Sequence, residues 1–265
     1  MEQEIKNKFS WQRVWEFGMI YKSSIKVQLL LYAVITVLSY IAIIPFSDVT
    51  STHFIPIYSL LSIVVAYELY VSPVVFGRID ESLLAQLPVK TSEKVTFYLL
   101  YILVLLPCYV EALWYGSNFI GNHLFGIADV MTASNTFVKE LYEVEVSSSV
   151  FICGMVNSIM QTAAIVMTTL FVVLKAHGQR VLKGLLTPLV IIISIGVVSG
   201  IGGFIVAITS TVTALSNSED VGEHVVQSLV NRMPVMTMCI ATLMLIYCVI
   251  IGIYTYRLVR NRQIS

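Results

Sequence analysis

The stretch GRIDESLLAQLPVKTSEKVTFYLLYILVLLPCYVEALWYGSNFI, residues 77–120, decides the fold of this chain. Its first part, residues 77–94, is polar and charged, whereas residues 95–120 form an apolar run with one charged residue, Glu111. The hydrocarbon core of a bilayer is about 30 Å thick, and a helix needs about 20 residues to cross it. The apolar run therefore predicts a membrane-spanning helix that follows a charged connection.

Five further apolar runs have a similar length, so the sequence predicts six spanning helices. The predicted spans are residues 27–46, 54–77, 95–120, 150–174, 185–212 and 235–256. Hydrophobic residues make up 57% of the chain and charged residues 12%, whereas charged residues are about 25% of a typical soluble protein. We therefore expect an all-α, polytopic membrane protein in which residues 1–265 form a single transmembrane domain.

Lysine and arginine are distributed unequally among the segments that connect these spans. Fourteen of the sixteen lie before the first span, in the second and fourth connections, or after the last span. Only Lys139 and Arg232 lie in the other three connections, which are acidic. Because short cytoplasmic loops accumulate Lys and Arg, we expect both termini to be cytoplasmic in an inner (plasma) membrane. A net charge of zero gives no reason to expect a nucleic-acid partner.

Residues 10–26, before the first span, have the pattern of an amphipathic helix. An apolar stripe follows the i, i+3, i+4 rule, and Ser10 is suited to cap the helix. The stripe consists of Trp11, Val14, Trp15, Gly18 and Ile25. The segment also carries Arg13 and Lys22, and a basic, tryptophan-rich helix of this kind lies in the membrane interface without crossing it. The alternative is an ordinary juxtamembrane helix without a partner.

The second connection predicts a docking surface on the cytoplasmic side. A short helical piece from Asp80 to Leu87 is ended by Pro88, and Leu83, Leu84 and Leu87 share one face of it. An exposed apolar patch flanked by charges usually marks a binding surface. A new helix then begins near Ser92, which is suited to cap it, with Glu93 in its electropositive first turn. The predicted docking residues are Asp80, Glu81, Leu84, Leu87, Pro88, Glu93 and Lys94.

The last two spans carry signals for packing and for an outer helix. Gly196 and Gly200 form a G-x-x-x-G pattern, which lets membrane helices approach closely and otherwise marks a hinge. In the fifth connection, apolar residues between Val221 and Val230 predict a short amphipathic helix that stops at Pro234.

Glu68 and Glu111 are the two charged residues placed well inside predicted spans. A charge at this depth costs several kcal/mol unless it is paired, hydrated or protonated. Both are candidates for a translocation path, and packing at a helix interface is the alternative for each. Neighbouring tyrosines are placed to donate hydrogen bonds to each acid: Tyr67 and Tyr70 to Glu68, and Tyr109 and Tyr115 to Glu111. The two acids differ in depth by about 10 Å, so they are not expected to form one pair.

Enzyme and metal templates are missing from the sequence. It contains no H-E-x-x-H, no G-x-S-x-G and no G-x-x-x-x-G-K-[ST] pattern. The histidines are spread over several connections, and the cysteine spacing fits no zinc pattern, so neither a metal nor a catalytic site is predicted. If the protein performs active transport, another chain must hydrolyse the nucleotide.

The combined features resemble the permease subunit of bacterial type-2 ABC exporters, including those of Bacteroidetes. The resemblance lies in FSWQRVWEFGMIYKSS, residues 9–24, in LLAQLPVKTSEKVTFYLL, residues 83–100, and in the six-span arrangement. It implies that residues 11–22 form an elbow helix and that residues 80–94 contact an ATPase subunit. It also implies a homodimer or a heterodimer with a second permease, with ATP and magnesium bound by the ATPase and no cofactor in this chain.

We therefore expect the membrane component of an exporter of unknown substrate, working by alternating access. Two alternatives stay open. One is a scaffold or sensor that signals through its acidic outer loops, and the other is an ion-coupled carrier that uses Glu68 or Glu111 as a proton site.

The predicted orientation can be tested by cysteine labelling. In a background without the four native cysteines, which all lie within predicted spans, Ser134→Cys and Ser218→Cys should react with an impermeant thiol reagent in intact cells. Ser92→Cys should react only after the cells are permeabilised, because the basic connections face inward. Labelling of Ser92→Cys in intact cells would reverse the orientation.

Overall fold

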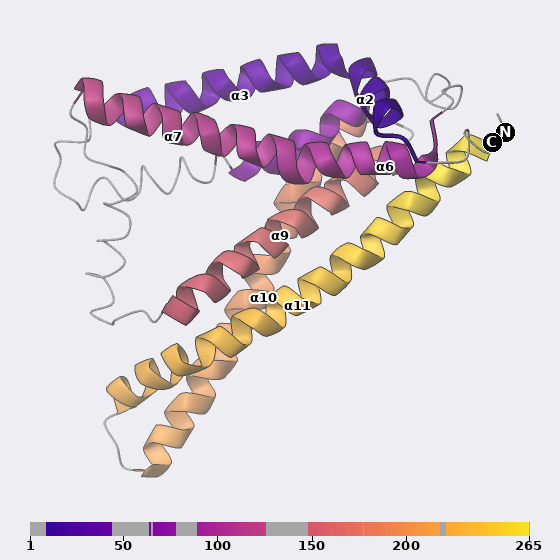
Figure 1. Ribbon diagram of the computed structural model, residues 1–265. Helices are drawn as coiled ribbons and strands as arrows, with labels where there is room; N and C mark the ends of the chain where they lie inside the picture. The colour runs from indigo at the N-terminus through magenta and orange to yellow at the C-terminus, as the bar shows by residue number, and fades with distance from the viewer. Residues whose placement is uncertain are drawn as a thin grey trace.

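The computed structural model describes residues 9–43, 64, 66–77, 89–125, 148–176, 178–217 and 221–264. Within these ranges all regular structure is helical (Figure 1). The longer helices are α2 Trp11–Ile20, α3 Lys22–Ile43, α6 Thr91–Leu100, α7 Leu106–Phe125, α9 Ser148–Lys175, α10 Arg180–Asn217 and α11 Val221–Ile264. Residues 66–71 are also helical and lead into a 3-10 helix, η2 Ser72–Gly77.

Within the part of the chain that the structure describes, five helices are long and apolar enough to cross a membrane. They are Lys22–Ala42, Thr91–Leu124, Ile152–Lys175, Arg180–Val197 and Thr237–Asn261. Large apolar side chains such as Leu30, Ile193 and Leu243 are exposed on these helices, as expected of surfaces that face lipid. The second predicted span, residues 54–77, falls largely outside the described residues. The regular structure of the described residues is thus all helical and compatible with a membrane location.

The N-terminal helix ends earlier than the sequence predicted. Residues 10–26 were expected as one interfacial helix, but α2 ends at Ile20, the chain turns at Tyr21, and α3 begins at Lys22. The turn has a packing reason, because it places the Tyr21 side chain, which is fully buried, inside the core. Ser10 is the N-cap residue of α2, as predicted, but its side chain makes no capping hydrogen bond.

The third predicted span is one continuous helix with a local irregularity. Helix α6 begins at Thr91 with Lys90 as its N-cap, so the predicted cap at Ser92 is wrong, whereas Glu93 does lie in the first turn. A π-helical turn, η3 Tyr101–Leu105, joins α6 to α7. Such turns place one more residue in the turn than an α-helix does and are frequent at functional sites.

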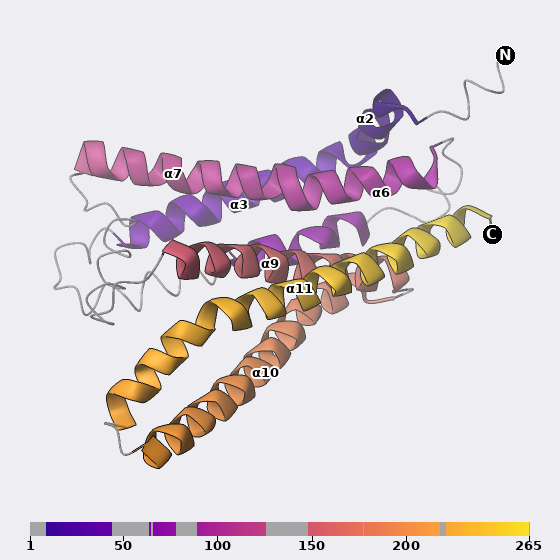
Figure 2. The ribbon, with the colours of Figure 1, turned by 60° about the horizontal axis from the view of Figure 1, so that its bottom comes forward.

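The C-terminal helices pack on one another around α9. Helix α9 contacts both α10 and α11, and it begins and ends within two residues of the predicted span (Figure 2). The prediction of a separate outer helix that stops at Pro234 is wrong, because α11 runs unbroken through this residue. Proline is tolerated inside long apolar helices where neighbouring groups satisfy the freed carbonyl. Helix α10 likewise contains Pro188.

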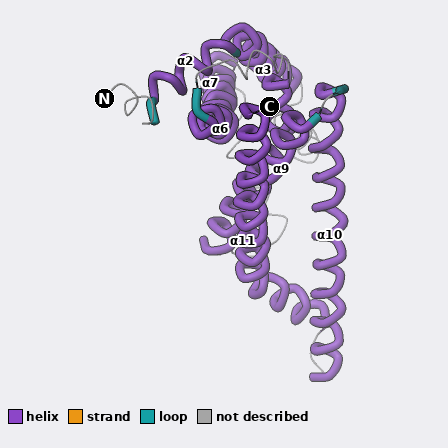
Figure 3. Tube along the Cα trace, turned by 90° about the vertical axis from the view of Figure 1, so that its right-hand side faces the viewer, coloured by secondary structure: helices purple, strands orange, loops and turns teal. Residues whose placement is uncertain are grey.

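The N-terminal helices, α2 to α7, and the C-terminal helices α9 and α11 share one buried core. Helix α3 lies beside α7, and α2 packs on α6 at the end of the molecule where the C-terminus also lies (Figures 1 and 3). Helices α6 and α11 are in contact, and η2 packs against α9. The buried apolar cluster therefore takes side chains from α2, α3, η2, α6, α7, α9 and α11.

Candidate functional site

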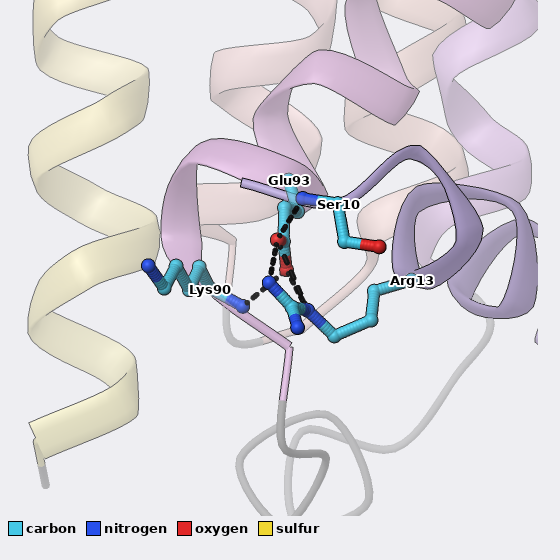
Figure 4. Close-up of polar contacts among 4 residues, drawn as sticks. All are labelled: Ser10, Arg13, Lys90 and Glu93. Carbon is cyan, nitrogen blue, oxygen red and sulfur yellow. Dashed lines mark hydrogen bonds and ion pairs between the residues drawn. The ribbon is translucent and has the colours of Figure 1, made fainter. Parts of the chain in front are cut away.

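The candidate site is centred on the carboxylate of Glu93, at the start of α6. Its side chain is 0% exposed and forms an ion pair with Arg13 of α2, with the shortest contact at 2.6 Å (Figure 4). Arg13 Nε donates to Oε2 at 3.0 Å and Nη2 donates to Oε1 at 2.6 Å, and Nε also lies 3.1 Å from Oε1. This forked geometry is the strong form of an arginine–carboxylate interaction. A pair 80 residues apart in sequence thus joins α2 to the base of α6.

The same carboxylate also accepts two backbone hydrogen bonds. Ser10 N–H donates to it at 2.9 Å and Lys90 N–H at 3.0 Å (Figure 4). These are the N-cap residues of α2 and α6, so Glu93 satisfies an amide at the start of each helix. A negative charge is stabilised at a helix N-terminus, and here one carboxylate lies at the N-termini of both α2 and α6. The hydrogen bond to Glu93 raises the pKa of the Arg13 guanidinium, which stays charged.

An aromatic cluster lies next to the ion pair and continues the contact between α2 and α6. The Tyr21 and Tyr98 hydroxyls are 3.1 Å apart, and the rings of Phe76 and Tyr98 are 4.6 Å apart at their centroids. The cluster consists of Phe17, Tyr21, Phe76, Phe97, Tyr98 and Tyr101, from α2, η2, α6 and η3. Edge-to-face rings add stabilisation beyond the apolar area they bury.

Gly18 allows the close approach of α2 to α6. A Cβ atom on Gly18 would lie within van der Waals overlap of Phe97, 2.8 Å from its Cζ atom. Lys94, 2% exposed, lies with its ammonium 5.9 Å from the centroid of the Phe17 ring, a cation–π distance. The interface between the two helices is therefore packed tightly on both sides of Glu93.

A second polar network ties α3 to η2 and to the π-helical turn. Gln28 donates to the Tyr32 hydroxyl at 2.8 Å and to the Ser72 carbonyl at 3.3 Å, and it accepts from Tyr101 at 2.7 Å. Tyr32 in turn donates to the backbone carbonyl of Glu68 at 2.6 Å. All these groups are removed from solvent, so each bond is costly to break without replacement.

The predicted docking residues divide into two groups. Asp80, Glu81, Leu84, Leu87 and Pro88 lie outside the described residues. Glu93 and Lys94 are buried, so in this conformation their charges act inside the chain instead of facing a partner. The prediction that Asp80, Glu81, Leu84, Leu87 and Pro88 contact a partner stays a prediction.

The predicted interfacial residues have unequal positions. Trp11 and Trp15 are 63% and 67% exposed, so the tryptophans of the predicted stripe point away from the protein. Helix α2 instead buries Val14, Phe17 and Gly18 against its neighbours. Lys22 is the first residue of α3 and is exposed. An exposed tryptophan pair on one helix is the arrangement expected at a membrane interface.

The two predicted intramembrane acids differ in their surroundings. Glu68 is 5% exposed, and neither carboxylate oxygen has a hydrogen-bond partner among the described residues, so the expected bonds from Tyr67 and Tyr70 are wrong. The Tyr67 hydroxyl donates to the Leu185 carbonyl instead. Glu111 lies on the exposed face of α7.

Tyr109, expected as a partner of Glu111, donates to the Leu29 carbonyl at 3.0 Å.

Among the described residues, no group of three His, Cys, Asp or Glu side chains is placed to hold a metal ion.

Sequence reasoning missed the ion pair of Arg13 with Glu93 and the links made by Gln28. A partial signal was present, because Glu93 was placed in a first turn and Arg13 off the apolar stripe of α2. Comparison with known proteins adds no further assignment: no protein-family model, no curated protein and no solved structure matches the chain.

Replacing Glu93 should release α2 from α6. Glu93→Ala leaves the N–H groups of Ser10 and Lys90 and the Arg13 guanidinium without their acceptor, which costs about 2 kcal/mol or more. Amide hydrogen exchange across α2 should then be about 30-fold faster or more. Glu93→Gln, which keeps an acceptor, should have a smaller effect.

Glu16→Gln is the matched control, because Glu16 is an exposed acid on α2 whose side chain bonds only within that helix. Its exchange should resemble that of the parent protein. Unchanged protection of α2 in Glu93→Ala would show that the carboxylate does not hold the helix.

Proposed function

We propose that this chain is the permease subunit of an ABC-type exporter, driven by ATP that a separate ATPase subunit hydrolyses. In the proposed arrangement both termini are cytoplasmic, six helices cross the inner membrane, and α2 lies in the interface as the elbow helix. The support for the membrane location is the set of five long apolar helices and the inward bias of basic residues.

The observation that carries the proposal is the position of the Glu93 junction. Residues 80–94 form the segment proposed to contact the ATPase, and Glu93 lies near its end, in the first turn of α6. Because the same carboxylate holds the start of α2, a force on this segment reaches both helices together. A device that converts ATPase closure into helix tilting requires such a rigid connection.

The chain is proposed to work as a dimer, either with itself or with a second permease. Glu111 supports this, since it is exposed on α7 within a candidate span, where a charge facing lipid costs several kcal/mol. A partner subunit or a water-filled path against this face would remove that cost. The substrate is left open.

One observation favours a second candidate function, an ion-coupled carrier. Glu68 is buried with both carboxylate oxygens unpartnered among the described residues, which suits a group that binds and releases a proton. We prefer the exporter, because the carrier hypothesis assigns no role to the docking segment, residues 80–94, or to the junction at Glu93.

The docking segment provides the test. The tagged chain, purified from its native membrane in mild detergent, should bring with it an ABC ATPase recognised by its phosphate-binding loop. The double variant Leu84→Asp with Leu87→Asp should reduce this co-purification at least tenfold, because two charges replace the apolar contact. Mass spectrometry of the purified material and its ATPase activity are the measurements.

The control variant is Ser218→Asp, which adds a charge in a predicted outer connection. Leu185→Asp is unsuitable as a control, because it would place a charge within a predicted span. The Ser218→Asp variant should leave co-purification unchanged. An undiminished yield of ATPase with the double variant would remove residues 80–94 as the interface. Transport that continues without any ATPase and stops with a proton uncoupler would favour the carrier.

A further inference from the structure

An apolar groove runs between the N-terminal helices and the helix that contains the π turn. It encloses about 430 Å³ and lies between α2 and α3 on one side and α6, η3 and α7 on the other. Its lining includes Trp15, Leu29, Tyr101 and Leu105, together with Lys22 and Lys26. The volume is that of a site for a small organic molecule or part of a larger one.

The irregular turn contributes to this groove directly. Tyr101 and Leu105 are the first and last residues of the π-helical turn, and both line the groove. A π turn is a departure from regular helix geometry that commonly accompanies a binding function. On the opposite wall, α2 contributes Trp15, Gly18 and Met19 to the lining.

The charged residues that line the groove are two lysines, Lys22 and Lys26. Lys22 and Lys26 lie one turn apart on α3, both are exposed, and neither forms an ion pair with any carboxylate that the structure describes. Arg13, the nearest cation on α2 in sequence, is committed to Glu93. A slot with apolar walls and two unpaired ammonium groups is complementary to a molecule with an apolar chain and an anionic head.

The place of the groove in the membrane identifies such a molecule. In the proposed orientation, Lys22 and Lys26 lie at the cytoplasmic end of the first span, next to Trp15, which is exposed as expected at the headgroup level. Basic pockets between helices on the cytoplasmic side bind anionic headgroups. The inner leaflet supplies phospholipids whose acyl chains fit the apolar part.

We propose that this groove binds one anionic phospholipid of the inner leaflet, with its phosphate between Lys22 and Lys26 and an acyl chain along Leu29, Tyr101 and Leu105. The lipid would bridge α2, α3 and the π turn from outside, in addition to the hydrogen bond that Tyr101 donates to Gln28 inside the protein. The lipid site depends on the proposed orientation of the protein in the membrane and not on the exporter function. The lipid-site proposal and the exporter proposal can therefore fail independently.

Native mass spectrometry of the full chain tests the proposal. The protein is reconstituted with equal amounts of phosphatidylglycerol and phosphatidylcholine, extracted in detergent, and its retained lipid is identified. The parent protein should retain one phosphatidylglycerol in preference to phosphatidylcholine. Lys22→Gln with Lys26→Gln should weaken this retention by about fivefold for each lysine removed.

Lys183→Gln with Arg260→Gln is the charge-matched control. Both residues are exposed and lie on the same proposed side of the membrane, but they belong to α10 and α11, away from the groove. This variant should retain phosphatidylglycerol as the parent does. If this variant lost as much phosphatidylglycerol as the Lys22 and Lys26 variant, the retention would depend only on net charge. The proposed lipid site would then be wrong.

A third variant tests the apolar part of the groove independently of charge. Leu105→Trp adds bulk at an exposed position of the groove wall and should lower retention of the lipid with both lysines intact. Retention of the two lipids in equal amounts by the parent protein, or of phosphatidylglycerol unchanged in the double lysine variant, contradicts the proposal.

Discussion

A carboxylate that is removed from water must be neutralised where it stands, and Glu93 meets this requirement by drawing two helices together. Its partners are one guanidinium and two backbone amides, and they come from α2 as well as from α6. The charge cannot be separated from Arg13 without leaving an uncompensated ion in the protein. The position of α2, its turn at Tyr21 and the aromatic packing behind it are consistent with this single constraint.

The remainder of the fold is explained by the lipid bilayer that we propose surrounds it. The long helices keep their backbone groups bonded internally and leave large apolar side chains exposed, which suits lipid and not water. Polar side chains inside the protein are few and are used to join elements, as Gln28 does between α3, η2 and the π turn. Some buried polar atoms have no hydrogen-bond partner among the described residues, and they include both carboxylate oxygens of Glu68 and the hydroxyls of Thr36, Ser72 and Thr255.

The length and period of the apolar runs were sufficient to predict α9 closely, because a long uninterrupted run has only one helical solution in a bilayer. The turn at Tyr21 was not predicted, because it depends on burial of one aromatic side chain among residues from other elements. The passage of α11 through Pro234 was missed for a related reason, since proline ends helices in water more firmly than in apolar surroundings. The pairing of Arg13 with Glu93 spans 80 residues, and nothing local in one sequence specifies it.

The central claim is that Glu93 holds α2 against the base of α6 as one body. It can be measured as a distance, by electron paramagnetic resonance between spin labels at positions 12 and 96, on α2 and α6 respectively, in the reconstituted protein. We predict a single narrow distance distribution that becomes broad when Glu93 is replaced by alanine. A broad distribution in the parent protein, or a narrow one that survives Glu93→Ala, would contradict it.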